Sequence, residues 1–202
     1  MQSIDSKILS RIYGRGKGCV VTPCDFLDLG SRQAVDLALH RLAKKGTLRR
    51  LARGLYDYPR IDPDLGLLSP TIDTIVKALK GRDKILLQPS GGYAANLLGL
   101  SDQVPMKVVF LTDGPARHVQ IGKQLIMLKH TTPRAMASAG RVSGVVIQAL
   151  RHIGKRQVDD AVVTGLQKRL TANDKKQLLK DIRYAPAWIA AILRRLAGPE
   201  ER

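Results

Sequence analysis

Glutamate is almost missing from this 202-residue chain, since 15 of its 17 acidic residues are Asp and the two Glu are Glu200 and Glu201. Aromatic residues make up only 4%, which argues against a protein that stacks single-stranded bases on many exposed rings. No apolar run approaches the ~20 residues that a transmembrane helix needs. The first five residues also lack the basic and apolar segments of a signal peptide. We therefore expect a cytoplasmic protein.

Residues that support catalysis or metal binding are also few. The two cysteines, Cys19 and Cys24, cannot make a disulfide framework or a four-ligand zinc site, and the four histidines are scattered singly. Nuclease chemistry needs clustered carboxylates to hold a metal, and the Glu-x-Lys pattern does not occur. The glycine-rich run 14–18 lacks the spacing of a P-loop. We expect no enzymatic activity, no metal site and no cofactor.

Basic residues, in contrast, are abundant. The chain has 34 Lys and Arg against 17 acids, a formal net charge of +17. Such an excess opposes compaction and is typical of a protein with a polyanionic partner: nucleic acid, an anionic membrane surface or an acidic protein. The net charge is +7 over residues 1–60, +3 over 61–140 and +7 over 141–202, so the excess lies at the two ends. The 44% of hydrophobic residues can still build a core.

The first sixty residues follow the order of a winged helix-turn-helix domain. The patterns predict, in order, a helix from residue 4 to the glycine run, a short strand at 19–21, a helix from Thr22-Pro23 to Gly30, a helix from Ser31 to Gly46, and a hairpin of strands 47–51 and 55–58.

The third of these helices would be the recognition helix, whose first residues meet base edges in the major groove. The predicted base contacts are Ser31, Arg32, Gln33, Asp36 and His40. The predicted backbone and wing contacts are Arg15, Lys17, Arg41, Lys44, Lys45, Arg49, Arg50 and Arg53. Two alternatives stay open. Small helix–hairpin modules also bind proteins, and His40 alone also fits a solvated side chain.

A proline- and Asp-containing stretch, residues 59–69, is typical of a linker and divides a domain over 1–60 from a second over 61–202. The second domain is expected to hold a small antiparallel sheet and C-terminal helices, which makes the whole chain α+β. Its predicted elements are a helix from Ser69-Pro70, strands near 84–88, 108–112, 117–121 and 125–129, a short helix at 93–98, and helices from 142 onward. Trp188, on the last predicted helix, is expected to lie in the hydrophobic core.

Basic residues also form stripes on the predicted C-terminal helices. They define a second candidate basic surface, made of Arg141, Arg151, Lys155, Lys176, Lys180 and Arg183. Such stripes are commonly just solvated helix faces, so two interpretations stand side by side: a further nucleic-acid contact, or ordinary surface.

Several longer runs, covering roughly residues 5–135, carry a family resemblance. They are Gly30–Asp36, the basic wing Gly46–Pro59, Asn96–Leu100 followed by Leu111–Gly114, and Thr132–Arg134. In these runs the chain resembles the AbiEi-type antitoxins of abortive-infection toxin–antitoxin systems.

The resemblance implies that the N-terminal winged helix represses its own operon by binding repeats in the promoter. It also implies that the C-terminal domain neutralises a nucleotidyltransferase-like toxin encoded by the adjacent gene. Arg32 and Gln33 would then read bases, and Arg49, Arg50 and Arg53 would make the wing contacts. We expect a double-stranded-DNA-binding repressor that does not act on membranes. The alternative is a protein-binding antitoxin or adaptor, or a stand-alone regulator, and the sequence leaves the oligomeric state open.

Overall fold

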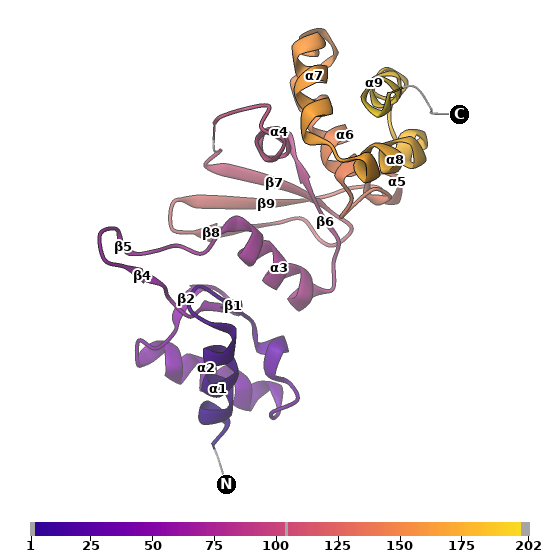
Figure 1. Cartoon of the computed structure of the whole chain (residues 1–202). Coiled ribbons are helices and arrows are strands. Elements are labelled where there is room, and N and C mark those ends of the chain that lie inside the picture. Colours follow the sequence, from indigo (N-terminus) through magenta and orange to yellow (C-terminus); the bar gives the residue numbers. More distant parts are fainter. Residues whose placement is uncertain (1–2, 104, 199–202) are drawn as a thin grey trace. The chain divides into compact units, whose positions relative to one another are not determined.

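The protein is described by a computed structural model that covers residues 3–103 and 105–198. Its fold is mixed α+β, as the sequence patterns predict, and its contacts divide it into unit 1, residues 1–85, and unit 2, residues 86–202 (Figure 1). The division falls after residue 85 rather than after residue 60, because α3 (Ile72–Asp83) packs against β1 (Val20–Val21) and the 3-10 helix η1 (Pro23–Phe26).

Two helices and η1 enclose the core of unit 1. These helices are α1 (Ile4–Arg15) and α2 (Arg32–Lys44). The second predicted helix is a single 3-10 turn, η1, because the carboxylate of Asp25 turns back to accept hydrogen bonds from the N–H and the hydroxyl of Thr22, at 2.7 and 2.8 Å. The core side chains are Ile8, Ile12, Val21, Phe26, Val35, Ala38, Leu39, Leu42, Leu48 and Tyr56.

A three-stranded antiparallel sheet completes this core, in the order β1-β3-β2. Strands β2 (Arg49–Ala52) and β3 (Leu55–Asp57) form a hairpin. Gly54 turns the chain between them at φ 65°, a left-handed conformation that glycine adopts without strain. The central strand β3 is buried along its length. Strand β2 lies at one edge of the sheet.

The predicted linker contains a hairpin of its own. β4 (Ile61–Asp62) pairs with β5 (Gly66–Leu67), and the carboxylate of Asp62 accepts the backbone N–H groups of Asp64 and Leu65, both at 3.0 Å. These two hydrogen bonds hold the pKa of Asp62 below its usual value. Three apolar side chains are exposed on this β4–β5 hairpin: Ile61 (68%), Leu65 (77%) and Leu67 (53%).

Unit 2 contains a four-stranded sheet in the order β6-β7-β9-β8. Its strands are β6 (Leu87–Ser90), β7 (Lys107–Thr112), β8 (Arg117–Ile121) and β9 (Gln124–His130). The prediction of an antiparallel sheet is wrong at one place, since β7 and β9 are parallel. The fully buried Ile126 and nearly buried Leu128 place β9 in the centre, whereas the polar β8 takes the edge and returns the chain so that β9 can run alongside β7.

The helices of unit 2 gather at one end of this sheet and form a second core among themselves (Figure 1). α4 (Gly91–Leu97) and β6 both pack against α6 (Val142–Ile153). The remaining elements are α5 (Pro133–Met136), η2 (Lys155–Gln157), α7 (Asp160–Arg169), α8 (Ala172–Asp181), η3 (Ile182–Tyr184) and α9 (Ala187–Ala197). Trp188 is partly buried against this core. Within residues 3–103 and 105–198, every helix is too short or too polar to span a bilayer.

Candidate nucleic-acid interface

The N-terminal end of α2 is closed by a cap. Ser31 has an extended backbone (φ −61°, ψ 153°), and its hydroxyl accepts a hydrogen bond from the backbone N–H of Ala34 at 3.3 Å. This bond satisfies one of the donors that the first turn of a helix leaves open. The hydroxyl of Ser31, predicted to meet bases, therefore already has a structural role.

Helix α2 has one buried and one exposed face. Its buried side chains, Val35, Ala38, Leu39 and Leu42, repeat at helical spacing and anchor it in the core of unit 1. The other positions consequently face solvent. The exposed side chains are Arg32, Gln33, Asp36, Leu37, His40, Arg41 and Lys44.

Arg32 is the most engaged of the predicted base-contacting residues. Its Nε donates to Asp36 Oδ2 at 3.0 Å, and the two side chains are 54% and 49% exposed. Exposed pairs at this i,i+4 spacing contribute only about 0.3–0.5 kcal/mol, so a base or phosphate could replace the carboxylate of Asp36. Gln33 and His40 have no hydrogen-bond partner within the described part of the chain and are available as they stand.

Leu37 lies on the same exposed face and was missed by the sequence analysis. Its side chain is 52% exposed, because other residues fill the buried face of this helix. Apolar side chains in a major groove contact the thymine methyl group. The signal in the sequence is its position, four residues after Gln33 and off the buried stripe.

The β2–β3 hairpin presents two further arginines. Arg50 lies on β2 and Arg53 at the turn, and both are exposed. Neither forms a salt bridge to any residue in the ranges that the structure describes. The carbonyl of Arg53 accepts a hydrogen bond from Arg82 Nη1 at 3.0 Å, which holds the turn while the Arg53 side chain stays in solvent.

Arg49, predicted as a third wing contact, has a different role. Its Nε and Nη2 donate to Oδ1 and Oδ2 of Asp57, at 3.0 and 2.5 Å, and Nη2 also donates to the carbonyl of Leu68 at 2.8 Å. Asp57 is only 1% exposed. The hydrogen bonds to Asp57 raise the pKa of Arg49. A buried carboxylate depends strongly on its cation, so Arg49 stabilises the hairpin and is not free to contact phosphate.

Pairing of an aspartate with an arginine recurs over the whole N-terminal segment. Each of the five Asp residues between positions 3 and 60 forms an ion pair with an arginine, and none pairs with a lysine. The pairs are Arg11–Asp28 at 2.7 Å, Arg15–Asp25 at 2.9 Å, Arg32–Asp36 at 3.0 Å, Arg41–Asp5 at 2.5 Å and Arg49–Asp57 at 2.5 Å. The hydrogen bond from Arg41 is the main reason that the pKa of Asp5 lies below its usual value.

Seven cations of this segment are left over, and they carry its net charge of +7. All are exposed and lack a salt bridge to the residues described: Lys7, Lys17, Lys44, Lys45, Arg50, Arg53 and Arg60. Five of the predicted backbone contacts are among them, whereas Arg15, Arg41 and Arg49 are paired. Lys7 and Arg60 were not predicted. These seven residues are the free cations of the N-terminal segment.

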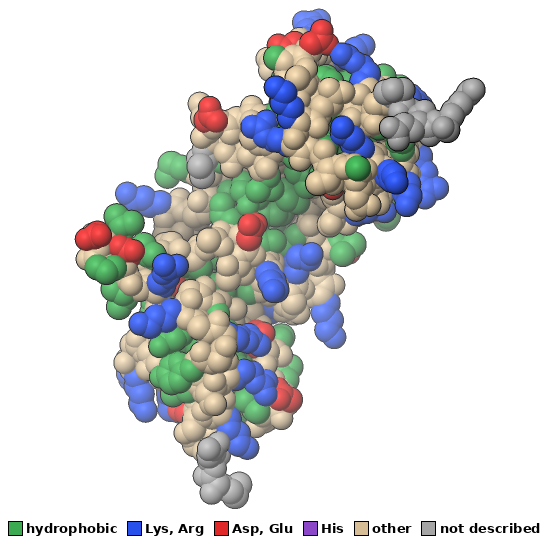
Figure 2. All heavy atoms as spheres, in the orientation of Figure 1, with side chains coloured by type: hydrophobic (Ala, Val, Ile, Leu, Met, Phe, Trp, Pro, Cys, Tyr) green, Lys and Arg blue, Asp and Glu red, His purple; other side chains and the backbone are tan. Residues whose placement is uncertain are grey.

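Unit 2 carries the second candidate basic surface. Five of its six predicted residues are exposed: Arg151, Lys155, Lys176, Lys180 and Arg183. Figure 2 shows Lys and Arg side chains in blue over the helices of unit 2. The guanidinium of Arg183 lies 4.9 Å from the ring centroid of Tyr184, an arrangement that favours a fixed cation.

Arg141, the sixth, belongs to a buried network instead. Its Nε lies 3.2 Å from Oδ2 of Asp181, which is 2% exposed. The same carboxylate accepts hydrogen bonds from the hydroxyl of Ser143 and from Gln177. Arg141 therefore neutralises a buried charge between α6 and α8. The prediction that it belongs to the second basic surface is wrong.

Comparison with known proteins gives a family. A family model described as "Family of unknown function (DUF6088)" matches residues 7–178. The chain belongs to the DUF6088 family. Among solved structures, it is similar to the RV2827C protein from Mycobacterium tuberculosis, with 18% identity and a TM-score of 0.45, over 96% of this chain and 77% of that one. Among curated proteins, none matches it.

The unpaired polar side chains described above lie on the surface of this DUF6088 chain. Across residues 3–103 and 105–198, no three His, Cys, Asp or Glu side chains are arranged to hold a metal ion. The residues that stand ready for a partner are the exposed face of α2 and the free cations.

Proposed function

We propose that this DUF6088 chain is a DNA-binding transcriptional regulator that reads double-stranded DNA with α2. The observation that carries the proposal is the exposed face of α2, where Arg32, Gln33 and Leu37 stand at the first two turns of a helix capped by Ser31. The order α1, η1, α2 and β2–β3 hairpin supports a winged helix-turn-helix.

Each part of this surface has a chemical task in the proposal. Arg32 and Gln33 make bidentate hydrogen bonds, to guanine and to adenine, and Leu37 contacts a thymine methyl group. Asp36 orients Arg32 until DNA arrives. The free cations, with Arg50 and Arg53 on the wing, contact phosphates and fix the register of the protein on the duplex.

The biological setting that we propose follows the resemblance to AbiEi-type antitoxins. The chain would repress its own promoter from the cytoplasm, and it would neutralise a nucleotidyltransferase-like toxin from the adjacent gene. The second basic surface, Arg151, Lys155, Lys176, Lys180 and Arg183, would extend the contact with DNA.

A second candidate function is protein binding as an antitoxin or adaptor. It is favoured by the β4–β5 hairpin, whose Ile61, Leu65 and Leu67 are exposed. Clustered exposed apolar side chains are typical of protein contacts. Co-expression with the adjacent gene product tests this function. Leu65→Asp should abolish co-purification, while Met106→Asp, at another exposed apolar site (67%) that lies in unit 2, should not.

The DNA-binding proposal is tested by fluorescence anisotropy at fixed salt. The two duplexes are the DNA upstream of the protein's own gene and a scrambled duplex of equal length and composition. Arg32→Ala should cost about 1–3 kcal/mol on the upstream duplex and much less on the scrambled one. Arg60→Ala removes the same charge from an exposed site outside α2 and should weaken both duplexes equally. Equal affinity of the wild-type protein for both duplexes would contradict sequence-specific binding.

A further inference from the structure

Unit 1 contains an open cleft that the DNA-binding surface does not use. The cleft has a volume of about 660 Å³ and is bounded by the end of α1, the segment from Cys19 to Asp25, and α3. Pockets that bind small molecules have volumes of about 300–1,000 Å³. The size therefore suits a metabolite rather than a macromolecule.

The charge of the cleft is positive. Arg15, Lys77 and Arg82 line it, against one acid, Asp25. The carboxylate of Asp25 is already occupied, since it accepts two hydrogen bonds from Thr22 and pairs with Arg15 at 2.9 Å. The ammonium of Lys77 is exposed and has no salt bridge or hydrogen bond to the residues that the structure describes. The cleft thus offers the unpaired ammonium of Lys77 on α3 to an anion. The charge of Asp25, the one acid in the lining, is already balanced by Arg15.

The rest of the lining is small and weakly polar. It includes the two thiols, Cys19 and Cys24, and the apolar side chains of Val20 and Ala78. A ligand that is complementary to this cleft carries an acidic group that pairs with Lys77 and a small carbon skeleton that packs against the weakly polar wall. This is the description of a small organic anion.

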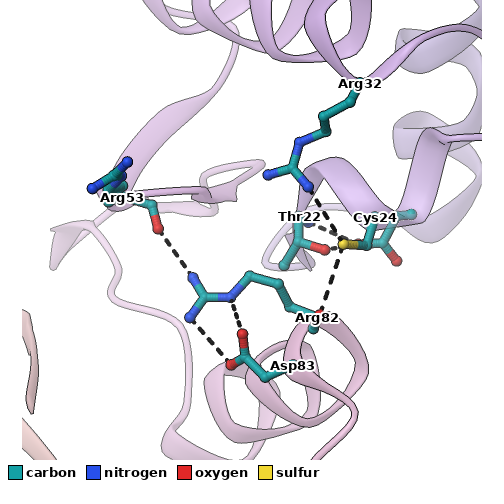
Figure 3. Close-up of polar contacts among 7 residues, drawn as sticks. Thr22, Cys24, Arg32, Arg53, Arg82 and Asp83 are labelled. Carbon is teal, nitrogen blue, oxygen red and sulfur yellow. Dashed lines mark hydrogen bonds and ion pairs between the residues drawn. The ribbon is translucent and has the colours of Figure 1, made fainter. Parts of the chain in front are cut away.

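The cleft is connected to both parts of the proposed DNA surface (Figure 3). The thiol of Cys24 donates to the carbonyl of Arg82 at 3.8 Å, and Arg32 Nη1 donates to the same sulfur at 3.9 Å. Arg82 in turn donates to the carbonyl of Arg53 at the wing turn, and its Nε and Nη2 are fixed by Asp83. A change at the wall of the cleft therefore reaches Arg32 and the turn that carries Arg53.

We propose that this cleft is an effector site for a small organic anion, bearing a carboxylate or a phosphate, whose binding weakens the hold on DNA. The anion pairs with Lys77 and places negative charge beside Arg15 and beside Cys24, whose sulfur Arg32 contacts, which lowers the positive potential that DNA phosphates meet. The anion site stands on the cleft alone, whereas its effect on DNA rests on the function proposed above.

Cysteine alkylation tests the site directly, because the chain has only two cysteines and both line the cleft. The full chain is treated with iodoacetamide, a neutral reagent, and each labelled peptide is quantified by mass spectrometry. The probes are citrate and glycerol 3-phosphate, which distinguish a carboxylate from a phosphate ligand. Sodium chloride at matched ionic strength and glycerol are the controls. At ten times its Kd, a probe should slow alkylation about tenfold, because only the empty fraction reacts.

Two lysine variants decide whether the protection is specific. Lys77→Ala should abolish it, while Lys80→Ala, on the same helix but outside the cleft lining, should leave it within about twofold of the wild type. The proposal is overturned if neither probe protects either thiol at about 10 mM, which is tenfold above a Kd of about 1 mM. It is also overturned if the two variants lose protection equally, since that is diffuse attraction to a basic chain.

The effect on DNA is measured separately, with the upstream duplex at constant ionic strength. The protecting probe should weaken binding by the wild-type protein at least threefold and should not affect Lys77→Ala. Protection without any change in DNA affinity would overturn the effector role. If the protein binds no DNA at all, the function proposed above fails, while the alkylation result still decides the anion site.

Discussion

Arg49 and Asp57 form a two-point ion pair across the β2–β3 hairpin, with Nε–Oδ1 at 3.0 Å and Nη2–Oδ2 at 2.5 Å. Because Asp57 is 1% exposed, removal of the guanidinium would leave a buried charge without a partner. Arg49→Ala should lower the free energy of unfolding by about 3 kcal/mol. Arg50→Ala, one residue along the same strand but unpaired, should change it by less than about 0.5 kcal/mol. Urea unfolding followed by circular dichroism measures both, and equal stabilities of the two variants would contradict the structural role of Arg49.

Arg53 should contribute to DNA affinity through charge alone. Its side chain is exposed at the wing turn and forms no salt bridge to the described residues. Arg53→Ala should reduce the slope of log K against log salt by about 0.9, the value for one phosphate contact, and should weaken binding to all sequences alike. Anisotropy titrations over a range of salt concentrations measure this slope. A selective loss on one sequence would instead indicate base reading.

The second basic surface can be tested in the same titration. Charge reversal at Arg151 and Lys155, both exposed at the end of α6 and in η2, should flatten the salt dependence further if this surface meets DNA. The expected decrease in slope is about 0.9 for each lost phosphate contact. An unchanged slope would identify these side chains as an ordinary solvated face.

Gly144 occupies a place in α6 where no side chain fits. A Cβ there would lie 2.4 Å from the carbonyl oxygen of Ser138 and 2.5 Å from Oε1 of the buried Gln88. Gly144→Ala should therefore destabilise the protein by about 1–3 kcal/mol, the cost of overpacking. Gly165→Ala in α7, whose Cβ would meet only the Arg169 guanidinium at 3.6 Å, should be neutral or stabilising by up to about 1 kcal/mol. Thermal unfolding of the two variants in parallel makes the comparison, and similar melting temperatures would contradict the close approach.

The pair between Asp5 and Arg41 should make stability depend on pH in the acid range. The pKa of Asp5 lies below its ordinary value of 3.8 in the folded protein, chiefly through the hydrogen bond from Arg41. A lowered folded pKa stabilises the protein above the unfolded pKa, and this contribution is lost as the pH falls through the folded pKa. Arg41→Ala should therefore reduce stability at pH 7 but have little effect at pH 2. A loss of equal size at both values would mean that Arg41 acts through packing instead.

Local signals in the sequence predicted α1 and α2, whereas the helix expected from Thr22-Pro23 to Gly30 is only the 3-10 turn η1. The predicted start of the third helix at Ser31 is confirmed, because an N-cap is decided by residues within three positions. The strand β8 also matches its predicted range. Strand order could not be predicted, because the parallel pairing of β7 with β9 depends on partners far apart in the sequence.

The candidate site divides in the same way. Exposure on α2 follows from helical periodicity, so the exposed positions of Gln33 and His40 could be predicted, while their contact with bases stays a prediction. Partners of arginines do not follow from it. Arg49 and Arg141 are occupied by Asp57 and Asp181, and only the folded chain brings these side chains together.

The preference of Asp for Arg in the N-terminal segment has a chemical consequence. Of the seven free cations, four are lysines: Lys7, Lys17, Lys44 and Lys45. Acylation removes the charge of a lysine, and the guanidinium groups that hold the five carboxylates are not amines. Mild acetylation would thus take more than half of the segment's surplus charge while every one of its ion pairs stays in place. Affinity for polyanions and stability of the fold are carried by two different amino acids and can be adjusted independently.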